Sequence, residues 1–155
     1  MTQDSIQIDV PRSVLVAAFF EKMARASAPE TPDLHTFLDT PAIGARYLGG
    51  IYAGPTIDIG PMALILLPGE YTGTWEGARA WAAQQGEGAT LPSRIDALLL
   101  LKNLKSEFQE AYYWTDESVA LNGAYAWFQS FSNGGQYYYH KGYDYRARAV
   151  RRVAI

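Results

Sequence analysis

The hydrophobic pattern of this chain changes from helical spacing to strand alternation at Ala111, and this change constrains the fold more than any other feature. Before it, apolar residues recur at helical spacing over residues 75–85, with Thr74 as a suitable N-cap. A second helix is predicted to begin after Ser93, where Asp96 stands three residues on in a capping-box arrangement. We expect its buried face to consist of Ile95, Leu98, Leu99 and Leu101.

Strands are predicted on both sides of this helix pair. The short apolar run 63–67 is typical of a buried strand, and Ser132–Gly135 is a turn signal between two later strands. The later strands are expected over residues 111–115, 124–131, 136–140 and 146–153. The order of one strand, two helices and then an antiparallel meander predicts an α+β fold with the helices segregated from the sheet.

The first sixty residues have a different character. The alternation over residues 5–10 predicts a short strand, and residues 12–27 are predicted to form a helix whose apolar side chains would cover much of its circumference. A Pro/Gly-rich connector follows, in which a short helix is possible over residues 33–38. We therefore divide the chain into residues 1–60, which would serve oligomerisation or attachment, and residues 61–155, which would form the main domain.

The stretch "LPSRIDALLLLKNL … YYWTDES … YAWFQSFSNGGQYYYHKGYDYRARAVRRV" resembles a phage and prophage domain of unknown function in the C-type-lectin-like superfamily. Relatives of that domain include formylglycine-generating-enzyme-like folds and the variable receptor-binding proteins of diversity-generating retroelements. The resemblance covers about residues 64–153 and implies a C-type-lectin-like domain. Residues 1–60 carry no such resemblance.

The resemblance also implies where a ligand would bind. In the retroelement relatives the diversified positions lie between the turn that matches "FSNG" and the strand that matches "RAVR". Tyrosine suits such a surface, because its ring gives a large contact area at a small cost in side-chain entropy. The candidate ligand-binding residues are Tyr137, Tyr138, Tyr139, His140, Tyr143, Asp144 and Tyr145, with support from Tyr112, Tyr113, Asp116 and Tyr125. The alternative is an aromatic strand pair with half of its rings packed on the core.

Residue types argue against catalysis and against bound cofactors. The chain has no cysteine, which excludes disulfides, thiolate zinc sites and the cysteine chemistry of the oxidase relatives. The two histidines, His35 and His140, are far apart and lack metal-ligand spacing. The sugar-binding motifs of calcium-dependent lectins are missing as well. We expect a non-catalytic binding module without metal or cofactor.

The net charge of -3 argues against a general nucleic-acid binder, although cations gather near the C-terminus. These cations, Arg146, Arg148, Arg151 and Arg152, either form an anion-binding patch or pair with acids such as Glu107, Glu110, Asp116 and Glu117. We expect the second role, because they belong to the scaffold motif of the resemblance. Binding of single-stranded nucleic acid is the weakest hypothesis.

We expect a protein partner of the host and a homo-oligomer formed through the N-terminal helix. An alternative is an intracellular phage effector that inhibits a host defence or DNA-processing enzyme; the acidic residues Asp4, Asp9, Glu30, Asp33, Asp39 and Asp58 motivate it. The polar N-terminus is not typical of a signal peptide, so we expect none, and the longest apolar run, 62–67, is too short to span a bilayer. We therefore expect a protein of the infected cell's cytoplasm or of the virion.

Overall fold

The computed structural model describes residues 40–56, 58 and 60–155. The predicted N-terminal strand (5–10) and the helices at 12–27 and 33–38 lie outside the described residues, as do all the acidic residues cited for the effector hypothesis except Asp58. In the part that is described, no helix combines the length and hydrophobicity that crossing a bilayer requires.

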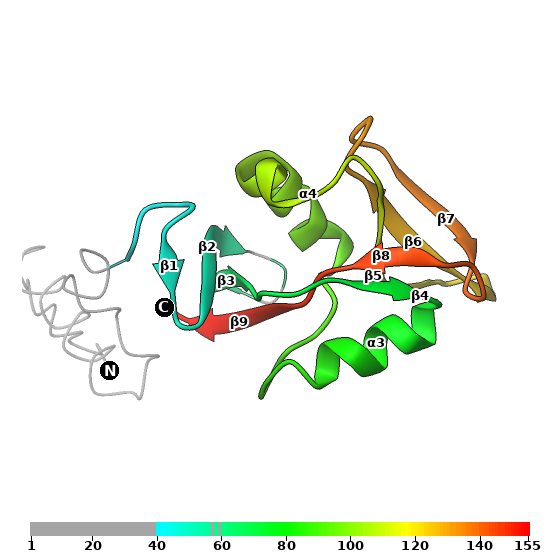
Figure 1. The fold of residues 1–155 in the computed structure, drawn as a ribbon, viewed down its shortest axis with the longest axis horizontal. Helices are drawn as coiled ribbons and strands as arrows, with labels where there is room; N and C mark the ends of the chain where they lie inside the picture. The colour runs from blue at the N-terminus through cyan, green and yellow to red at the C-terminus, as the bar shows by residue number, and fades with distance from the viewer. Residues whose placement is uncertain (1–39, 57, 59) are drawn as a thin grey trace, which may run out of the picture. The chain divides into compact units, whose positions relative to one another are not determined.

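The described chain forms two sheets and two α-helices (Figure 1). The four-stranded sheet has the order β1 (Arg46–Tyr47), β2 (Gly50–Thr56), β3 (Met62–Leu66), β9 (Val150–Ala154). The five-stranded sheet has the order β4 (Tyr71–Gly73), β8 (Tyr145–Ala147), β5 (Tyr112–Val119), β6 (Asn122–Ser130), β7 (Gln136–His140). The pairing is antiparallel except between β5 and β8. The α+β class predicted from the sequence is confirmed.

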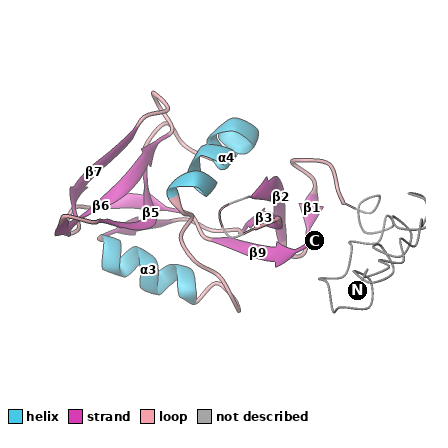
Figure 2. Cartoon of the chain, turned by 180° about the vertical axis from the view of Figure 1, so that it is seen from behind, coloured by secondary structure: helices cyan, strands magenta, loops and turns pink. Residues whose placement is uncertain are grey.

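The two helices lie on opposite sides of the strands, as both views show (Figures 1 and 2). Helix α3 (Trp75–Ala83) packs with Trp114 and Phe128 in one core cluster, and α4 (Arg94–Leu104) packs with Tyr113 and Phe131 in another. Strand alternation produces this division, because neighbouring residues of a strand point to opposite faces. β3 is buried on both faces, so its continuous apolar run is explained.

Both predicted helix N-caps are confirmed. Thr74 accepts a hydrogen bond from the Gly77 backbone N–H, and Ser93 accepts one from the Asp96 N–H. The predicted buried face of α4 is wrong, because Ile95 and Leu98 are both 47 % exposed. The buried residues of this helix are Asp96, Ala97, Leu100 and Leu104.

Asp96 explains the orientation of α4. Its side chain is fully buried, accepts a 2.5 Å hydrogen bond from the Thr56 hydroxyl and forms an ion pair with Arg152. These partners come from β2 and β9, so the carboxylate ties the helix to the four-stranded sheet. A buried carboxylate without such partners would be strongly destabilising.

Two further predictions are corrected. The domain boundary at residues 60 and 61 falls inside the four-stranded sheet, because β2 pairs with β3 over Ile51–Leu66 to Thr56–Met62. The single strand expected at 146–153 is two strands, β8 and β9, which belong to different sheets. The chain passes from one sheet to the other at residues 148 and 149, where Arg148 donates hydrogen bonds to the carbonyls of Leu67 and Glu107.

Candidate functional site

Five tyrosines lie on the face of the five-stranded sheet that also carries α3, three of them in contact with Phe128 and two joined to these through Tyr145. The ring of Phe128 lies 5.9 Å from Tyr137, 4.9 Å from Tyr112 and 4.8 Å from Tyr145. The ring of Tyr143 lies 4.6 Å from Tyr139 and 6.0 Å from Tyr145. We call this group the tyrosine cluster: Tyr112, Tyr137, Tyr139, Tyr143 and Tyr145.

The strands explain why these rings meet. Tyr137 and Tyr139 are two residues apart on β7 and therefore share a face, and Tyr137 lies opposite Phe128 of β6. A turn closed by the Tyr143 N–H and the His140 carbonyl leads the chain away from β7. The chain then enters β8 at Tyr145, which lies 5.5 Å from Tyr112.

The cluster is exposed over a buried base. Tyr112, Tyr137, Tyr139 and Tyr143 are between 42 % and 54 % exposed, whereas Phe128 beneath them is 5 % exposed. At least three rings of the predicted interval are therefore exposed, as the binding hypothesis requires. Burial raises the pKa of Tyr145, and the neighbouring phenol of Tyr143 raises the pKa of Tyr139. These hydroxyls are thus protonated at neutral pH and able to donate hydrogen bonds.

Three other predicted site residues lie on the opposite face of the same strands. Tyr138 packs against Trp127, with ring centroids 5.0 Å apart, and Tyr125 lies 5.9 Å from His140. The guanidinium of Arg94 stacks 3.6 Å from the Trp127 ring. The sequence-predicted interval is therefore divided between two faces, and Tyr138, His140 and Tyr125 do not belong to the tyrosine cluster.

Tyr113 is not on either surface, which corrects its assignment as a ligand-binding residue. It is 2 % exposed, and its ring meets the stacked rings of Phe108 and Phe131 edge-on, at 5.0 and 5.1 Å. Its hydroxyl accepts from the Gln109 N–H and donates to Glu70. Burial is the main reason that the pKa of Tyr113 is raised. Its neighbour Tyr112 points to the other face and joins the cluster.

The two predicted acidic site residues are separated. Asp116 forms a 3.0 Å ion pair with Arg79 of α3, away from the cluster. Asp144 lines a pocket of about 340 Å³ that shares Tyr112 and Tyr145 with the cluster. The other residues of this pocket are Thr72, Glu110, Ala111, Ser132 and Arg146. It adds polar groups beside the exposed rings, and sequence reasoning did not find it because its residues come from separate strands and turns.

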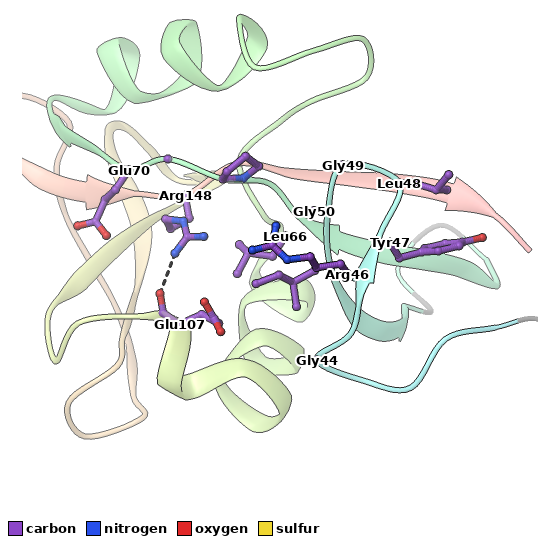
Figure 3. Close-up of a pocket in the computed structure, with 13 residues that line it drawn as sticks. Gly44, Arg46, Tyr47, Leu48, Gly49, Gly50, Leu66, Glu70, Glu107 and Arg148 are labelled. Carbon is purple, nitrogen blue, oxygen red and sulfur yellow. Dashed lines mark hydrogen bonds between the residues drawn. The ribbon is translucent and has the colours of Figure 1, made fainter.

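A larger pocket of about 900 Å³ lies beside the β1–β2 loop (Figure 3). Figure 3 shows Arg148 between Glu70 and Glu107 at one end. The Arg148 guanidinium already donates to two backbone carbonyls, at 2.7 and 3.1 Å, and burial lowers its pKa. This cation therefore serves the scaffold. Sequence reasoning missed the pocket because it placed residues 46–51 outside the main domain.

The four C-terminal arginines all bind within the scaffold. Arg146 forms a 2.5 Å ion pair with Glu70, and Arg151 donates to the Leu48 carbonyl. The expectation that these cations have structural partners is confirmed, although the partners are Glu70, Asp96 and backbone carbonyls, that of Glu107 included, and not the predicted carboxylates. Among the described residues, no three His, Cys, Asp or Glu side chains gather as a metal site would require.

Comparisons with known proteins give matches among solved structures only. No protein-family model and no curated protein matches this chain. One similar solved structure is that of botrocetin, which has a C-type-lectin-like fold; the match has a TM-score of 0.46 and 12 % sequence identity. It covers 74 % of this chain and 100 % of the botrocetin chain.

Proposed function

We propose that this chain is a non-catalytic, phage-type binding module with a C-type-lectin-like scaffold, and that the tyrosine cluster contacts a protein of the host. The observation that carries the proposal is a set of phenol rings, four of the five exposed, that contact one another or the buried Phe128 beneath them. Exposed aromatic patches of this kind are uncommon on proteins without a partner.

The chemistry of the cluster favours a protein ligand. Tyrosine anchors recur in the centres of protein interfaces, because a ring contributes apolar area and its hydroxyl contributes a hydrogen bond. The pocket beside the cluster adds Glu110, Asp144 and Arg146 as a polar rim. Phosphate recognition would need available cations, and the arginines of this region are bound within the scaffold.

The rigid mounting of the rings supports binding as well. β5 and β6 are central strands of the sheet, and Gln129 on β6 uses its amide to bind the carbonyls of Ser130, Gly134 and Gly135 in the β6–β7 turn. The turn is therefore fixed before a ligand arrives. A preorganised surface loses less conformational entropy on binding than a mobile one.

The test is substitution of Tyr137, Tyr139 and Tyr143 with alanine, followed by capture of the partner from host lysate and measurement of its affinity. We expect loss of capture by more than 100-fold, in the range of interface hot spots. The matched control is Tyr125→Ala on the opposite face, which should retain capture. Equal binding by the triple variant and the wild type would disprove the assignment of this surface.

A further inference from the structure

β7 is an edge strand, and its outer backbone groups have no partner among the described residues apart from the His140 carbonyl, which accepts from the Tyr143 N–H of the following turn. The β6–β7 ladder includes the Ser130 N–H donating to the Gly135 carbonyl and the Lys141 N–H donating to the Ala124 carbonyl, both at 2.9 Å. Backbone groups of an antiparallel strand alternate in direction. Residues 135, 137, 139 and 141 therefore face β6, and Gln136, Tyr138 and His140 direct their N–H and C=O groups outward.

This edge lacks the features that usually prevent strand pairing. Proteins protect sheet edges with proline, lysine, bulges or a covering element. β7 contains neither proline nor a charged residue apart from a titratable histidine, and its register with β6 is regular. The adjacent Lys141 does not guard the edge, because its ammonium lies 4.2 Å from the Trp75 ring. Figure 1 shows no element on the outer side of β7.

The sequence of β7 is nearly palindromic about its central residue. Gln136–Tyr137–Tyr138–Tyr139–His140 has a tyrosine at the centre, tyrosines on both sides of it and a polar residue at each end. When two such strands pair antiparallel about a two-fold axis at Tyr138, each aromatic residue lies opposite an aromatic residue and Gln136 lies opposite His140. Aromatic cross-strand pairs stabilise such a register, and no like charges oppose each other at neutral pH.

We propose that β7 pairs with β7 of a second copy of this chain, with the two-fold axis at Tyr138. Tyr138 would exchange both backbone hydrogen bonds with its symmetry mate, and the His140 N–H would donate to the Gln136 carbonyl of the other copy. The interface is isologous, as in most homodimers. It differs from the N-terminal helix as a route to oligomers, and it does not depend on the proposed function.

The pairing has a consequence for the tyrosine cluster. Tyr137 of one copy would lie opposite Tyr139 of the other, on the face that carries the cluster, so the two clusters would join into one aromatic surface. Tyr138, on the other face, would meet its symmetry mate. The dimer would thus present two equivalent copies of the proposed binding surface side by side.

Cysteine cross-linking tests the proposal without competing disulfides from natural thiols, because the chain has no cysteine. In the proposed pair the two Cα atoms of residue 138 are about 5.5 Å apart, which is within the range of a disulfide. The full-length Tyr138→Cys variant should form a covalent dimer under mild oxidation at least ten times faster than Leu121→Cys. Leu121 is fully exposed and outside β7, so it reports random collisions. Equal rates for the two variants would overturn the proposal.

Register is tested by mixing two other variants. Residues 137 and 139 of different copies would be directly opposite, with Cα atoms about 4.5 Å apart. Each residue would be about 7–8 Å from its own symmetry mate, beyond easy bridging. A mixture of Tyr137→Cys and Tyr139→Cys, distinguished by mass, should therefore cross-link mainly as the mixed dimer. A random distribution of the three possible dimers would refute the axis at Tyr138.

Discussion

The tyrosine-rich segment 136–145 and the arginine-rich segment 146–154 are consecutive in the chain. They differ in whether their side chains are exposed to solvent or bound to other parts of the protein. The rings of Tyr137, Tyr139 and Tyr143 are exposed, while Arg148 and Arg152 bind carbonyls and a buried carboxylate. Both compositions are common in ligand-binding surfaces. The difference teaches that a cluster of cations in a sequence indicates recognition only when the scaffold leaves the cations without partners.

The largest effect, on the free energy of unfolding, is expected at the ion pair between Arg152 of the arginine-rich segment and Asp96 of α4. Asp96→Ala removes the acceptor of Thr56 and leaves Arg152, whose side chain is 14 % exposed, without its counter-ion. Loss of one partner of a buried pair costs about 3–5 kcal/mol. Urea denaturation should show a decrease of this size in the free energy of unfolding.

The control for that prediction is Asp116→Ala, which removes an exposed partner of Arg79. Exposed ion pairs contribute about 0–1 kcal/mol. A similar loss of stability in both variants would show that the arginine segment does not have the structural role described here.

The same contrast between bound and exposed side chains exists between two neighbouring tyrosines. Tyr113 is buried and hydrogen-bonded to Glu70, whereas Tyr112 is exposed. Tyr113→Phe removes these hydrogen bonds and should lower the free energy of unfolding by about 1 kcal/mol. Tyr112→Phe should change it less. Denaturation curves of the two variants at pH 7 measure the difference.

The same residue gives a pH dependence. Burial raises the pKa of Tyr113 in the folded state above its ordinary value of 10.0, so the unfolded state loses its proton first as the pH rises. Stability from this source is complete below pH 10 and falls above it. The thermal midpoint of the wild type should therefore decrease above pH 10, and the decrease should be smaller in Tyr113→Phe. An equal slope in both proteins would assign the effect to other tyrosines.

Substitution within the tyrosine cluster should change stability little. Tyr143 is 54 % exposed, and exposed side chains far from special backbone features contribute little to folding. Tyr143→Ala should shift the thermal midpoint by less than about 3 °C in differential scanning calorimetry. A larger decrease would mean that the ring holds the scaffold together, as the arginines do.

The smallest signal is expected in a binding assay with nucleic acid. Because the arginines are bound within the scaffold, a single-stranded DNA oligonucleotide should show no detectable affinity at low salt. A gel-shift titration at increasing salt measures this. Binding that weakens steeply with salt would show that the cations remain available and would break the contrast between the two segments.

The sequence predicted those parts of the fold that local chemistry determines. Thr74 and Ser93 cap their helices as expected, and Gly134 adopts a φ of +82° in the predicted turn, a conformation that favours glycine. The buried face of α4 was not predictable from its pattern, because leucine occupies positions 98–101 and every face is apolar. Its orientation depends on Thr56 and Arg152, which are distant in sequence.

The candidate site was also predictable only where the local sequence pattern determines the structure. Alternation guarantees that a tyrosine-rich strand exposes rings, and the interval 136–145 does so. The pattern did not show which rings share a face with Phe128, or that Tyr112 is exposed and Tyr113 buried. Those facts depend on strand order, in which β8 lies between β4 and β5 and β7 at the edge. Only the assembled sheet specifies that order.

The passage from β8 to β9 also bears on how the chain is made. β8 is an inner strand of one sheet, and β9 contributes to the other sheet immediately afterwards. The five-stranded sheet lacks an inner strand until Tyr145–Ala147 has left the ribosome, and the four-stranded sheet lacks β9 until Val150–Ala154 has followed. Both sheets are therefore completed only at the end of this domain's synthesis. Nascent chains stalled before Tyr145 are expected to remain sensitive to protease, and native structure should form in one late, cooperative step.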